Sequence, residues 1–304
     1  MATSYVRPVL TPAAERTRSS DGGPDRPLVS LTTDFGERDP SAAICRGVIL
    51  SIAPEVRLLD VSHEVAKYSI LDGALLLWSA LPYLPVGIHA AVVDPGVGTG
   101  RLPIGVRVAR GDVLVGPDNG LLVPAAERLG GIRAVHALES AEYRLPVVSA
   151  SFHGRDIFAP AAAHLALGVP LAAFGRALDP DRLVRLDLPQ PEIQRGALAT
   201  AVLYVDTFGN VKLAGERPDL EAALGELAEG DALLVDVGAG SGSRHTLQLG
   251  WQTTFGAVPA GQPLLYEDSY GRLCVAINQG NAGERFGLHA GDRVAIRHAI
   301  ADRA

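Results

Sequence analysis

An aspartate and an arginine flank a glycine-rich run in the stretch VVDPGVGTGR, which extends from Val92 to Arg101. Asp94 and Arg101 would meet if the chain between them turned back on itself. Glycines at alternate positions of the run allow a tight turn, because glycine adopts positive φ without strain. A carboxylate and a guanidinium held together in this way could take part in chemistry. An ion pair that merely closes the turn is the alternative.

A histidine flanked by Gly and Arg lies in the stretch SFHGRDIFAP, from Ser151 to Pro160. His153 lies at a predicted junction between a loop and a helix. Histidine changes its charge near neutral pH, so near an aspartate and an arginine it could be a proton-handling group. A purely structural role is the alternative for a single histidine.

The glycine run does not fit a phosphate-binding loop. The dinucleotide fingerprint requires G-x-G-x-x-G between a strand and a helix. Here the spacing is G-x-G-x-G, and the residues that follow, RLPIGVRVA, predict a strand. The helix N-terminus that would bind phosphate is therefore missing.

The elements that must position these side chains alternate along the first half of the chain. Strands are predicted at LVSLTT, VRLLDV and IHAAVV, which are residues 28–33, 56–61 and 88–93. Apolar residues at helical spacing predict helices over 45–52 and 71–78. This strand–helix alternation with short connections predicts a parallel, doubly wound sheet.

Acidic residues follow or end each of the three predicted strands: Asp34, Asp60 and Asp94. Any one of them could be an ordinary loop or cap residue. In open parallel sheets, ligands bind beyond the carboxyl ends of the strands. Three carboxylates at one edge of one sheet therefore indicate a binding site.

The chain is expected to contain two domains after a leader. Residues 1–27 predict a disordered leader, 28–190 a Rossmann-like α/β domain with a mostly parallel central sheet, and 191–304 a smaller all-β, barrel-like domain. The proline-rich, charged segment 178–196 predicts the linker. In the second domain, only residues 219–230 predict a helix.

Composition excludes several classes of partner. The net charge is −7 and the pI about 5.6, which argues against nucleic acid or an anionic membrane as the main partner. No apolar run is long enough for a membrane helix. Two cysteines cannot form a disulfide framework, and a cytoplasmic location is expected. The histidines are scattered without ligand spacing, so no metal is predicted.

Five motifs, taken together and in order, resemble one family. They are TDFG..D (Thr33–Asp39), VVDPGVG..R (Val92–Arg101), FHGRDIFAP (Phe152–Pro160), DTFGN (Asp206–Asn210) and NQGNA (Asn278–Ala282). The chain after Pro27 resembles the S-adenosyl-L-methionine (SAM) hydroxide adenosyltransferases, the hydrolase relatives of the fluorinating and chlorinating enzymes. The resemblance implies that water or hydroxide attacks C5′ of SAM, methionine leaves and adenosine is released, without a cofactor.

The resemblance also implies which residues act on the water. The family's Asp, Arg and His set corresponds to Asp94, Arg101 and His153 here. The halogenating relatives have a tyrosine in place of Asp94, and the fluorinating ones have a serine in place of Gly154. Because an ionised Asp94 would repel a halide, the hydrolase branch is favoured.

A substrate-binding set is implied on both domains. Its members are Asp34, Asp39, Ser41, Tyr68, Asp206, Phe208, Asn210, Ser269, Tyr270 and Asn278. Tyr270 replaces a family arginine and Pro40 departs from the family pattern, so methionine recognition is expected to differ. The family forms trimers in which each site lies between one subunit's N-terminal domain and its neighbour's C-terminal domain, which implies a homotrimer.

Three other functions remain open at this stage. The stretch ALLVDVGAGSG, Ala232 to Gly242, matches the loop that opens many SAM-dependent methyltransferases, although the residues after it alternate like a strand. A halogenase and a non-catalytic SAM or adenosine sensor would use the same pocket. Neither the preference for the R or S sulfonium epimer nor the group that takes the proton follows from the sequence.

Overall fold

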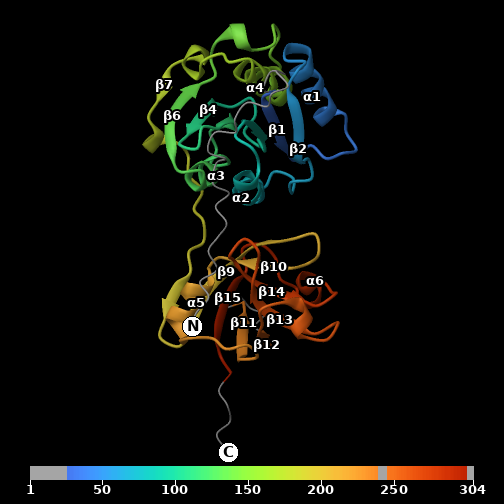
Figure 1. Ribbon diagram of the computed structural model, residues 1–304, viewed down its shortest axis with the longest axis vertical. Helices are drawn as coiled ribbons and strands as arrows, with labels where there is room; N and C mark the ends of the chain where they lie inside the picture. Colours follow the sequence, from blue (N-terminus) through green and yellow to red (C-terminus); the bar gives the residue numbers. More distant parts are fainter. Residues whose placement is uncertain (1–25, 239–244, 300–304) are drawn as a thin grey trace, which may run out of the picture. The chain divides into compact units, whose positions relative to one another are not determined.

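The structure of the chain is a computed structural model that describes residues 26–238 and 245–299 (Figure 1). The chain divides into two compact units, between Leu186 and Asp187. The predicted leader lies outside the described residues, apart from Arg26 and Pro27. We describe each unit by itself.

The first unit is built on a seven-stranded sheet with the strand order β2-β1-β3-β5-β4-β6-β7. Strands β2, β1, β3 and β5 are mutually parallel, whereas β4, β6 and β7 pair antiparallel. The strands are β1 (Leu28–Thr33), β2 (Arg57–Ser62), β3 (Ile88–Val92), β4 (Pro103–Val108), β5 (Val113–Pro117), β6 (Ile132–Ala137) and β7 (Ala177–Leu178).

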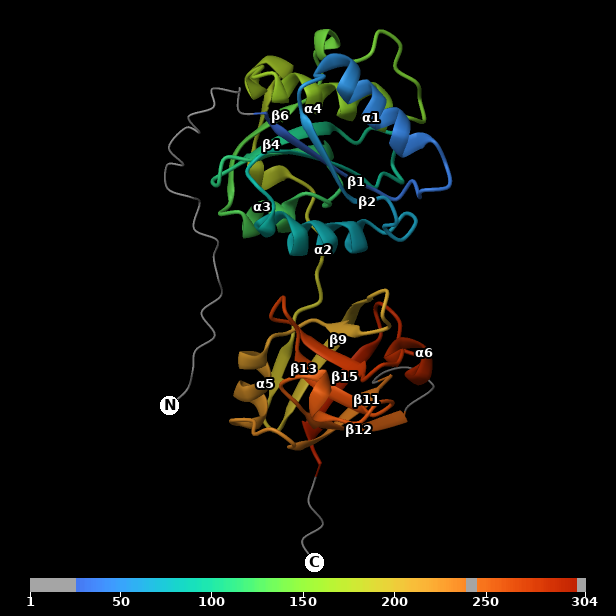
Figure 2. The ribbon, with the colours of Figure 1, turned by 45° about the vertical axis from the view of Figure 1, so that its right-hand side comes forward.

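Helices cover both faces of this sheet (Figure 2). One face carries α1 and α4, and the other carries α2 and α3, with a separate apolar core on each side. Alternation along β3 and into Val93, the residue after it, divides these side chains between the cores: Ala90 and Val92 belong to one, and Ala91 and Val93 to the other. The helices are α1 (Ser41–Ile52), α2 (Ile70–Ala80), α3 (Val123–Arg128) and α4 (Ala159–Ala166), with short helical turns η1 (Leu81–Tyr83), η2 (Ala141–Tyr143), η3 (Gly154–Phe158), η4 (Leu171–Phe174) and η5 (Pro180–Arg182).

The predicted parallel sheet is confirmed for the core of this unit. β1 has the predicted bounds, and the antiparallel β4 is the strand expected after the glycine run. The helix predicted from Arg155 begins differently. A π-helical turn, η3, runs directly into α4, and Pro160 lies in the first turn of α4.

The second unit is a β-barrel, as predicted. Strands run in the order β10-β14-β13-β12-β11-β15-β9-β8, and the additional pairing of β9 with β10 closes seven of them into a ring. The side chains of one continuous apolar cluster fill its interior. The strands are β8 (Glu192–Gln194), β9 (Ala197–Val205), β10 (Val211–Leu213), β11 (Ala232–Val237), β12 (His245–Trp251), β13 (Pro263–Glu267), β14 (Leu273–Ile277) and β15 (Arg293–His298).

Helices of the barrel unit differ from the prediction in two ways. Helix α5 (Arg217–Leu224) stops before Gly225, whose φ of +93° ends it short of the predicted Gly230. A second helix, α6 (Ala282–Phe286), was not predicted, because five residues show too little periodicity; its cap residue Asn281 accepts the N–H of Glu284. One short helical turn, η6 (Phe255–Ala257), completes the unit.

The methyltransferase alternative is wrong for the stretch that suggested it. β11 pairs antiparallel with β12, the next described element, in an uninterrupted register from Ala232↔Gly250 to Val237↔His245. A methyltransferase loop would lead into a helix and a parallel strand. Residues 239–244 of the stretch lie outside the described residues.

Candidate active site

A cavity of about 490 Å³ opens at the carboxyl ends of β1 and β3. This is the edge of the sheet at which the sequence predicted a site. Predicted site residues supply much of its lining, together with several that were not predicted. The lining residues are Asp34, Phe35, Asp39, Ser41, Lys67, Tyr68, Val92, Asp94, Val97, Ser151, Phe152, His153 and Gly154.

The glycine run brings Asp94 and Arg101 together, as predicted. Arg101 Nε donates to Asp94 Oδ1 at 2.9 Å, and Arg101 Nη2 donates to Asp94 Oδ2, so the pair is bidentate. Both side chains are more than nine-tenths buried. Among the glycines of the run only Gly98 needs positive φ (+78°), and a Cβ there would lie 2.6 Å from Ala150 O. That close approach packs the run against the segment that leads to His153.

His153 completes the cluster. Its Nδ1 atom lies 2.8 Å from Arg101 Nη2. Because a guanidinium only donates, Nδ1 must accept, and the proton of the neutral imidazole is then on Nε2. Burial, and next the positive charge of Arg101, hold the pKa of His153 below its ordinary value of 6.5. At neutral pH His153 is therefore a hydrogen-bond donor through Nε2, with Nδ1 already occupied.

A second carboxylate, Asp34, is held at the end of β1. Its Oδ2 atom accepts the backbone N–H of Tyr68 at 2.9 Å, and its carbonyl accepts from Lys67 Nζ. Tyr68 has φ +65°, a strained conformation for a residue with a side chain, and its ring is 73% exposed. The tight loop therefore presents Asp34 and a large aromatic surface at one cavity.

Asp39 and Ser41 lie at the start of α1. Asp39 Oδ1 accepts the backbone N–H of Ser41 at 2.9 Å and also its hydroxyl. These bonds from Ser41 lower the pKa of Asp39. Both residues line the cavity despite Pro40, which is the cap residue of α1.

The π turn sets the backbone next to His153. A Cβ on Gly154 would lie 2.9 Å from Phe35 Cζ, so a side chain there would require the Phe35 ring to move. Phe35 in turn packs edge-on against Phe152, with ring centroids 5.7 Å apart. Phe35, Lys67 and Phe152 were missed as lining residues, because each depends on a contact between distant loops; only their position beside predicted residues hinted at them.

The remaining predicted residues lie on loops of the barrel unit. Phe208 is 78% exposed at the tip of the turn between β9 and β10, and Asp206 and Asn210 close that turn by hydrogen bonds to each other. Ser269 and Tyr270 lie between β13 and β14. Asn278 follows β14, and its Nδ2 donates to Val258 O at 2.7 Å. The structure groups all of these predicted residues on loops of one unit.

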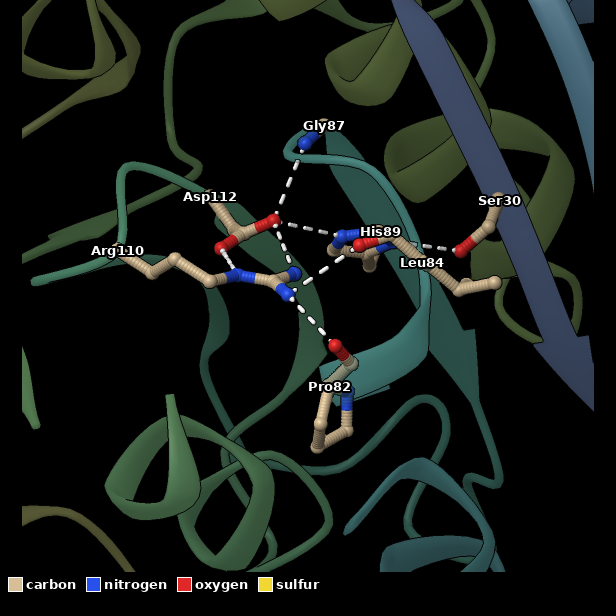
Figure 3. Close-up of polar contacts among 7 residues, drawn as sticks. All are labelled: Ser30, Pro82, Leu84, Gly87, His89, Arg110 and Asp112. Atoms are coloured by element: carbon tan, nitrogen blue, oxygen red, sulfur yellow. Dashed lines mark hydrogen bonds and ion pairs between the residues drawn. The ribbon is translucent and has the colours of Figure 1, made fainter. Parts of the chain in front are cut away.

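A second Asp–Arg–His cluster, absent from the prediction, lies at the opposite edge of the α/β sheet (Figure 3). His89 Nδ1 lies 2.7 Å from Ser30 Oγ, and its Nε2 lies 3.0 Å from Asp112 Oδ1. Arg110 donates to both oxygens of Asp112 and also to the carbonyls of Pro82 and Leu84. No sequence spacing connects these residues, because three separate strands bring them together.

This second cluster has the order Ser–His–Asp but no access to substrate. Ser30 and Asp112 are fully buried and His89 is 1% exposed, and none of the three lines the cavity. Burial alone would raise the pKa of Asp112, but hydrogen bonds from His89 and Arg110 hold it well below its ordinary value. The cluster is a structural tie between β1, β3 and β5.

Two features of the described residues limit other chemistries. No helix of residues 26–238 and 245–299 is long and apolar enough to cross a membrane. Within the same ranges, no three His, Cys, Asp or Glu side chains gather as a metal site would require.

Comparison with known proteins gives consistent matches over both units. Residues 29–175 match the model of the SAM hydroxide adenosyltransferase N-terminal domain, and residues 200–295 match that of the C-terminal domain. The chain is 44% identical over 270 residues to the (R)-S-adenosyl-L-methionine hydrolase of Salinispora tropica, covering 89% of this chain and 97% of the relative. Identity to the (R)-S-adenosyl-L-methionine hydrolase of Thermus thermophilus is 38%, with 88% and 97% covered.

Matches at lower sequence identity also cover most of the chain. A fluorinase of an Actinoplanes species is 30% identical, with 90% of this chain and 98% of the relative covered. A crystal structure of a conserved protein from Thermotoga maritima superposes with a TM-score of 0.81 at 31% identity, covering 89% of this chain and all of the other. The chain therefore belongs to the SAM hydroxide adenosyltransferase family, which is related to the fluorinases.

Proposed function

We propose that the chain is a hydrolase that cleaves SAM, as its R sulfonium epimer, to adenosine and L-methionine. The observation that supports this proposal most strongly is the Asp94–Arg101–His153 cluster at the cavity. The chain that carries it is 44% identical to an enzyme named for this reaction. In the proposed step, water or hydroxide forms a bond to C5′ as the C5′–S bond breaks. The electron pair of that bond goes to sulfur, and the proton of the water is released.

The cluster offers two hydrogen-bond donors and one acceptor to the attacking water molecule. His153 Nε2 carries a proton, and Arg101 Nη1 is buried without an acceptor among the described residues, so both can donate. Asp94, held by Arg101, is the acceptor that aligns and receives the proton of water. Alignment of the nucleophile can lower the barrier by about 7–11 kcal/mol in favourable cases, and a positioned base adds roughly 10²–10⁴-fold.

The sulfonium needs no acid, because methionine leaves as a neutral thioether. The task of the cavity is therefore to bind, align and exclude competing solvent. Asp34 would accept from the ribose hydroxyls, and Tyr68 would pack on the ligand. Asp39 and Ser41 would meet the methionine end.

We also propose that the barrel loops complete the site in a homotrimer, one subunit's barrel unit meeting its neighbour's cavity. The proposal rests on the family resemblance and on the exposure of Phe208 (78%) and Tyr68 (73%), which are large aromatic surfaces open to a partner. Sedimentation velocity tests it: a trimer is expected, and a monomer at assay concentration with full activity would overturn it. A cytoplasmic location is proposed as well, in keeping with two unpaired, buried cysteines.

Product analysis separates the hydrolase from its alternatives. The purified chain would be incubated with SAM in buffers containing chloride or fluoride, and the products separated by chromatography. We expect adenosine and methionine in equal amounts, at a rate independent of halide. Halogenated adenosine would indicate a halogenase, and intact SAM with measurable binding would indicate a sensor. Separated R and S epimers, supplied one at a time, test the epimer preference.

A further inference from the structure

Two turns of the barrel unit have the same hydrogen-bond pattern. One is DTFGN (Asp206–Asn210) between β9 and β10, and the other is DSYGR (Asp268–Arg272) between β13 and β14. In each, Oδ1 of the leading aspartate accepts the backbone N–H groups two and four residues later, at 2.8–2.9 Å. The fourth residue of each is a glycine, with φ of +83° and +82°. We call them the paired turns.

Each of the paired turns carries residues predicted to contact substrate. The first presents Phe208, which is 78% exposed, together with Asn210. The second presents Ser269 and Tyr270, between its aspartate and its glycine. Because each turn is closed by its own aspartate, its internal shape does not depend on the other turn. The antiparallel pairing of β10 with β14 sets the backbone separation of the two turns, and side-chain contacts hold their aspartates in place.

Lys212 connects the paired turns. Its Nζ atom lies 2.9 Å from Asp268 Oδ2 and 3.5 Å from Asp206 Oδ2. Alternation along β10 turns Val211 and Leu213 into the barrel core and Lys212 to the other face, where its side chain is only 6% exposed. One cation therefore bridges the second carboxylate oxygen of both turns.

The burial of this cation is consistent with its pairing with two carboxylates. Burial by itself lowers the pKa of a lysine, yet neighbouring groups, among them Cys274 and Asp268, hold the pKa of Lys212 above its ordinary value. A lysine is seldom this buried unless it is paired. The ammonium of Lys212 therefore lies near both carboxylates and links the two aspartates.

We propose that Lys212 is a positioning residue that holds the leading aspartates of the paired turns in place, and thereby tunes the fit of the nucleoside and methionine ends of the substrate. This inference rests on the proposed function, since it takes the turns to contact SAM. The turns carry none of the residues assigned to water activation. Loss of the bridge should therefore weaken binding and leave the chemical step nearly unchanged.

The test compares four variants of the full-length chain. Lys212→Met removes the cation but leaves two carboxylates facing each other, which could prevent folding. Lys212→Met/Asp268→Asn removes that repulsion, and the amide oxygen of the substituted asparagine can still accept the N–H groups that close the second turn. Arg297→Met breaks the Arg297–Asp236 ion pair between β15 and β11 of the same barrel and serves as the matched control.

Two readouts are taken on each folded variant: KM and kcat for SAM, and the Kd for adenosine by calorimetry. We expect the double variant to raise KM and the adenosine Kd about tenfold, a typical size for coupled contacts, with kcat within about twofold of wild type. Arg297→Met should change neither. Lys212→Arg, which keeps the charge, should restore most of the affinity.

A folded double variant with wild-type KM and Kd would overturn the proposal, and so would one that loses kcat at unchanged KM. Failure of the proposed function looks different. In that case the wild-type chain does not hydrolyse SAM at all, and the adenosine Kd still decides whether Lys212 positions the turns. Wild-type chain that binds no adenosine would overturn the role of Lys212 as well.

Discussion

The two edges of the α/β sheet carry the same three residue types with opposite consequences. At the carboxyl edge, Asp94, Arg101 and His153 meet beside a cavity. At the amino edge, His89 and Asp112 meet Arg110 and Ser30 in a sealed cluster (Figure 3). Residue type alone therefore does not identify the candidate site.

Hydrogen bonds to the histidine separate the two clusters further. His153 accepts a hydrogen bond from Arg101 on Nδ1, which leaves the Nε2 proton as a donor for a ligand. Both nitrogens of His89 have protein partners, Ser30 and Asp112. The histidine of the Asp94–Arg101–His153 cluster therefore has a hydrogen-bond donor available beside the cavity. The histidine of the Ser30–His89–Asp112 cluster has no ring nitrogen available for a ligand. Changes in the first should affect turnover, and changes in the second should affect stability.

The largest effect is expected for Asp94→Asn. Asparagine keeps the shape but loses the charge that aligns water and receives its proton, so kcat should fall by roughly 10²–10⁴-fold. The adenosine Kd should remain within about threefold. Steady-state kinetics and calorimetry measure both. Wild-type kcat in this variant would remove Asp94 from the reaction.

Asp112→Asn is the matched change at the sealed edge. It leaves Arg110 without its carboxylate, and breaking a buried pair in this way typically costs about 3–5 kcal/mol of unfolding free energy. Chemical denaturation should show a clearly lower midpoint. The fraction that remains folded, counted by active-site titration, should keep kcat within about threefold of wild type. A large loss of kcat per folded molecule would contradict a purely structural role for the Asp112 cluster.

Gly154→Ser tests how tightly the π turn packs beside His153. Its Cβ would lie 2.9 Å from Phe35 Cζ, and such overpacking costs about 1–3 kcal/mol. A lower melting temperature and reduced kcat/KM are expected. Gly47→Ser on α1 is the control, because a Cβ there meets nothing within 4 Å. Equal behaviour of the two variants would show that the Phe35 contact is unimportant.

The smallest effect concerns pH. The pKa of His153 is lowered, so the neutral form persists below the ordinary value of 6.5 and is lost only in more acid solution. Protonation would place an N–H on Nδ1 facing Arg101 and break their hydrogen bond. The kcat/KM profile should therefore fall on an acid limb below pH 6.5. His153→Gln should remove this limb and His89→Gln should keep it; an unchanged limb in His153→Gln would assign it elsewhere.

Sequence patterns predicted what depends on neighbours in the chain. β1 and β9 follow from short apolar runs, and the meeting of Asp94 with Arg101 follows from glycines between them. The contact of Arg101 with His153 spans 52 positions, so only the family resemblance pointed to it. The residue roles stay predictions until they are tested.

What the sequence could not predict depends on tertiary contacts. The Ser30–His89–Asp112 cluster joins three strands, and the spacing of these residues in the sequence does not predict it. The π turn at 154–158 was not predicted either, and its Gly154 packs against Phe35 and Phe152, one of which is more than a hundred positions away in the chain. Lys212 occupies one position of a three-residue strand, too short for periodicity to mark which side is buried.

The central claim is that water attacks C5′ of SAM at the Asp94–Arg101–His153 cluster. The most direct measurement is the mass spectrum of the products formed from SAM in ¹⁸O-labelled water. The account predicts the heavy oxygen in adenosine, at its 5′ position, and none in methionine, at a rate that Asp94→Asn greatly reduces. Unlabelled adenosine, or S-adenosylhomocysteine formed only with an acceptor, would contradict it.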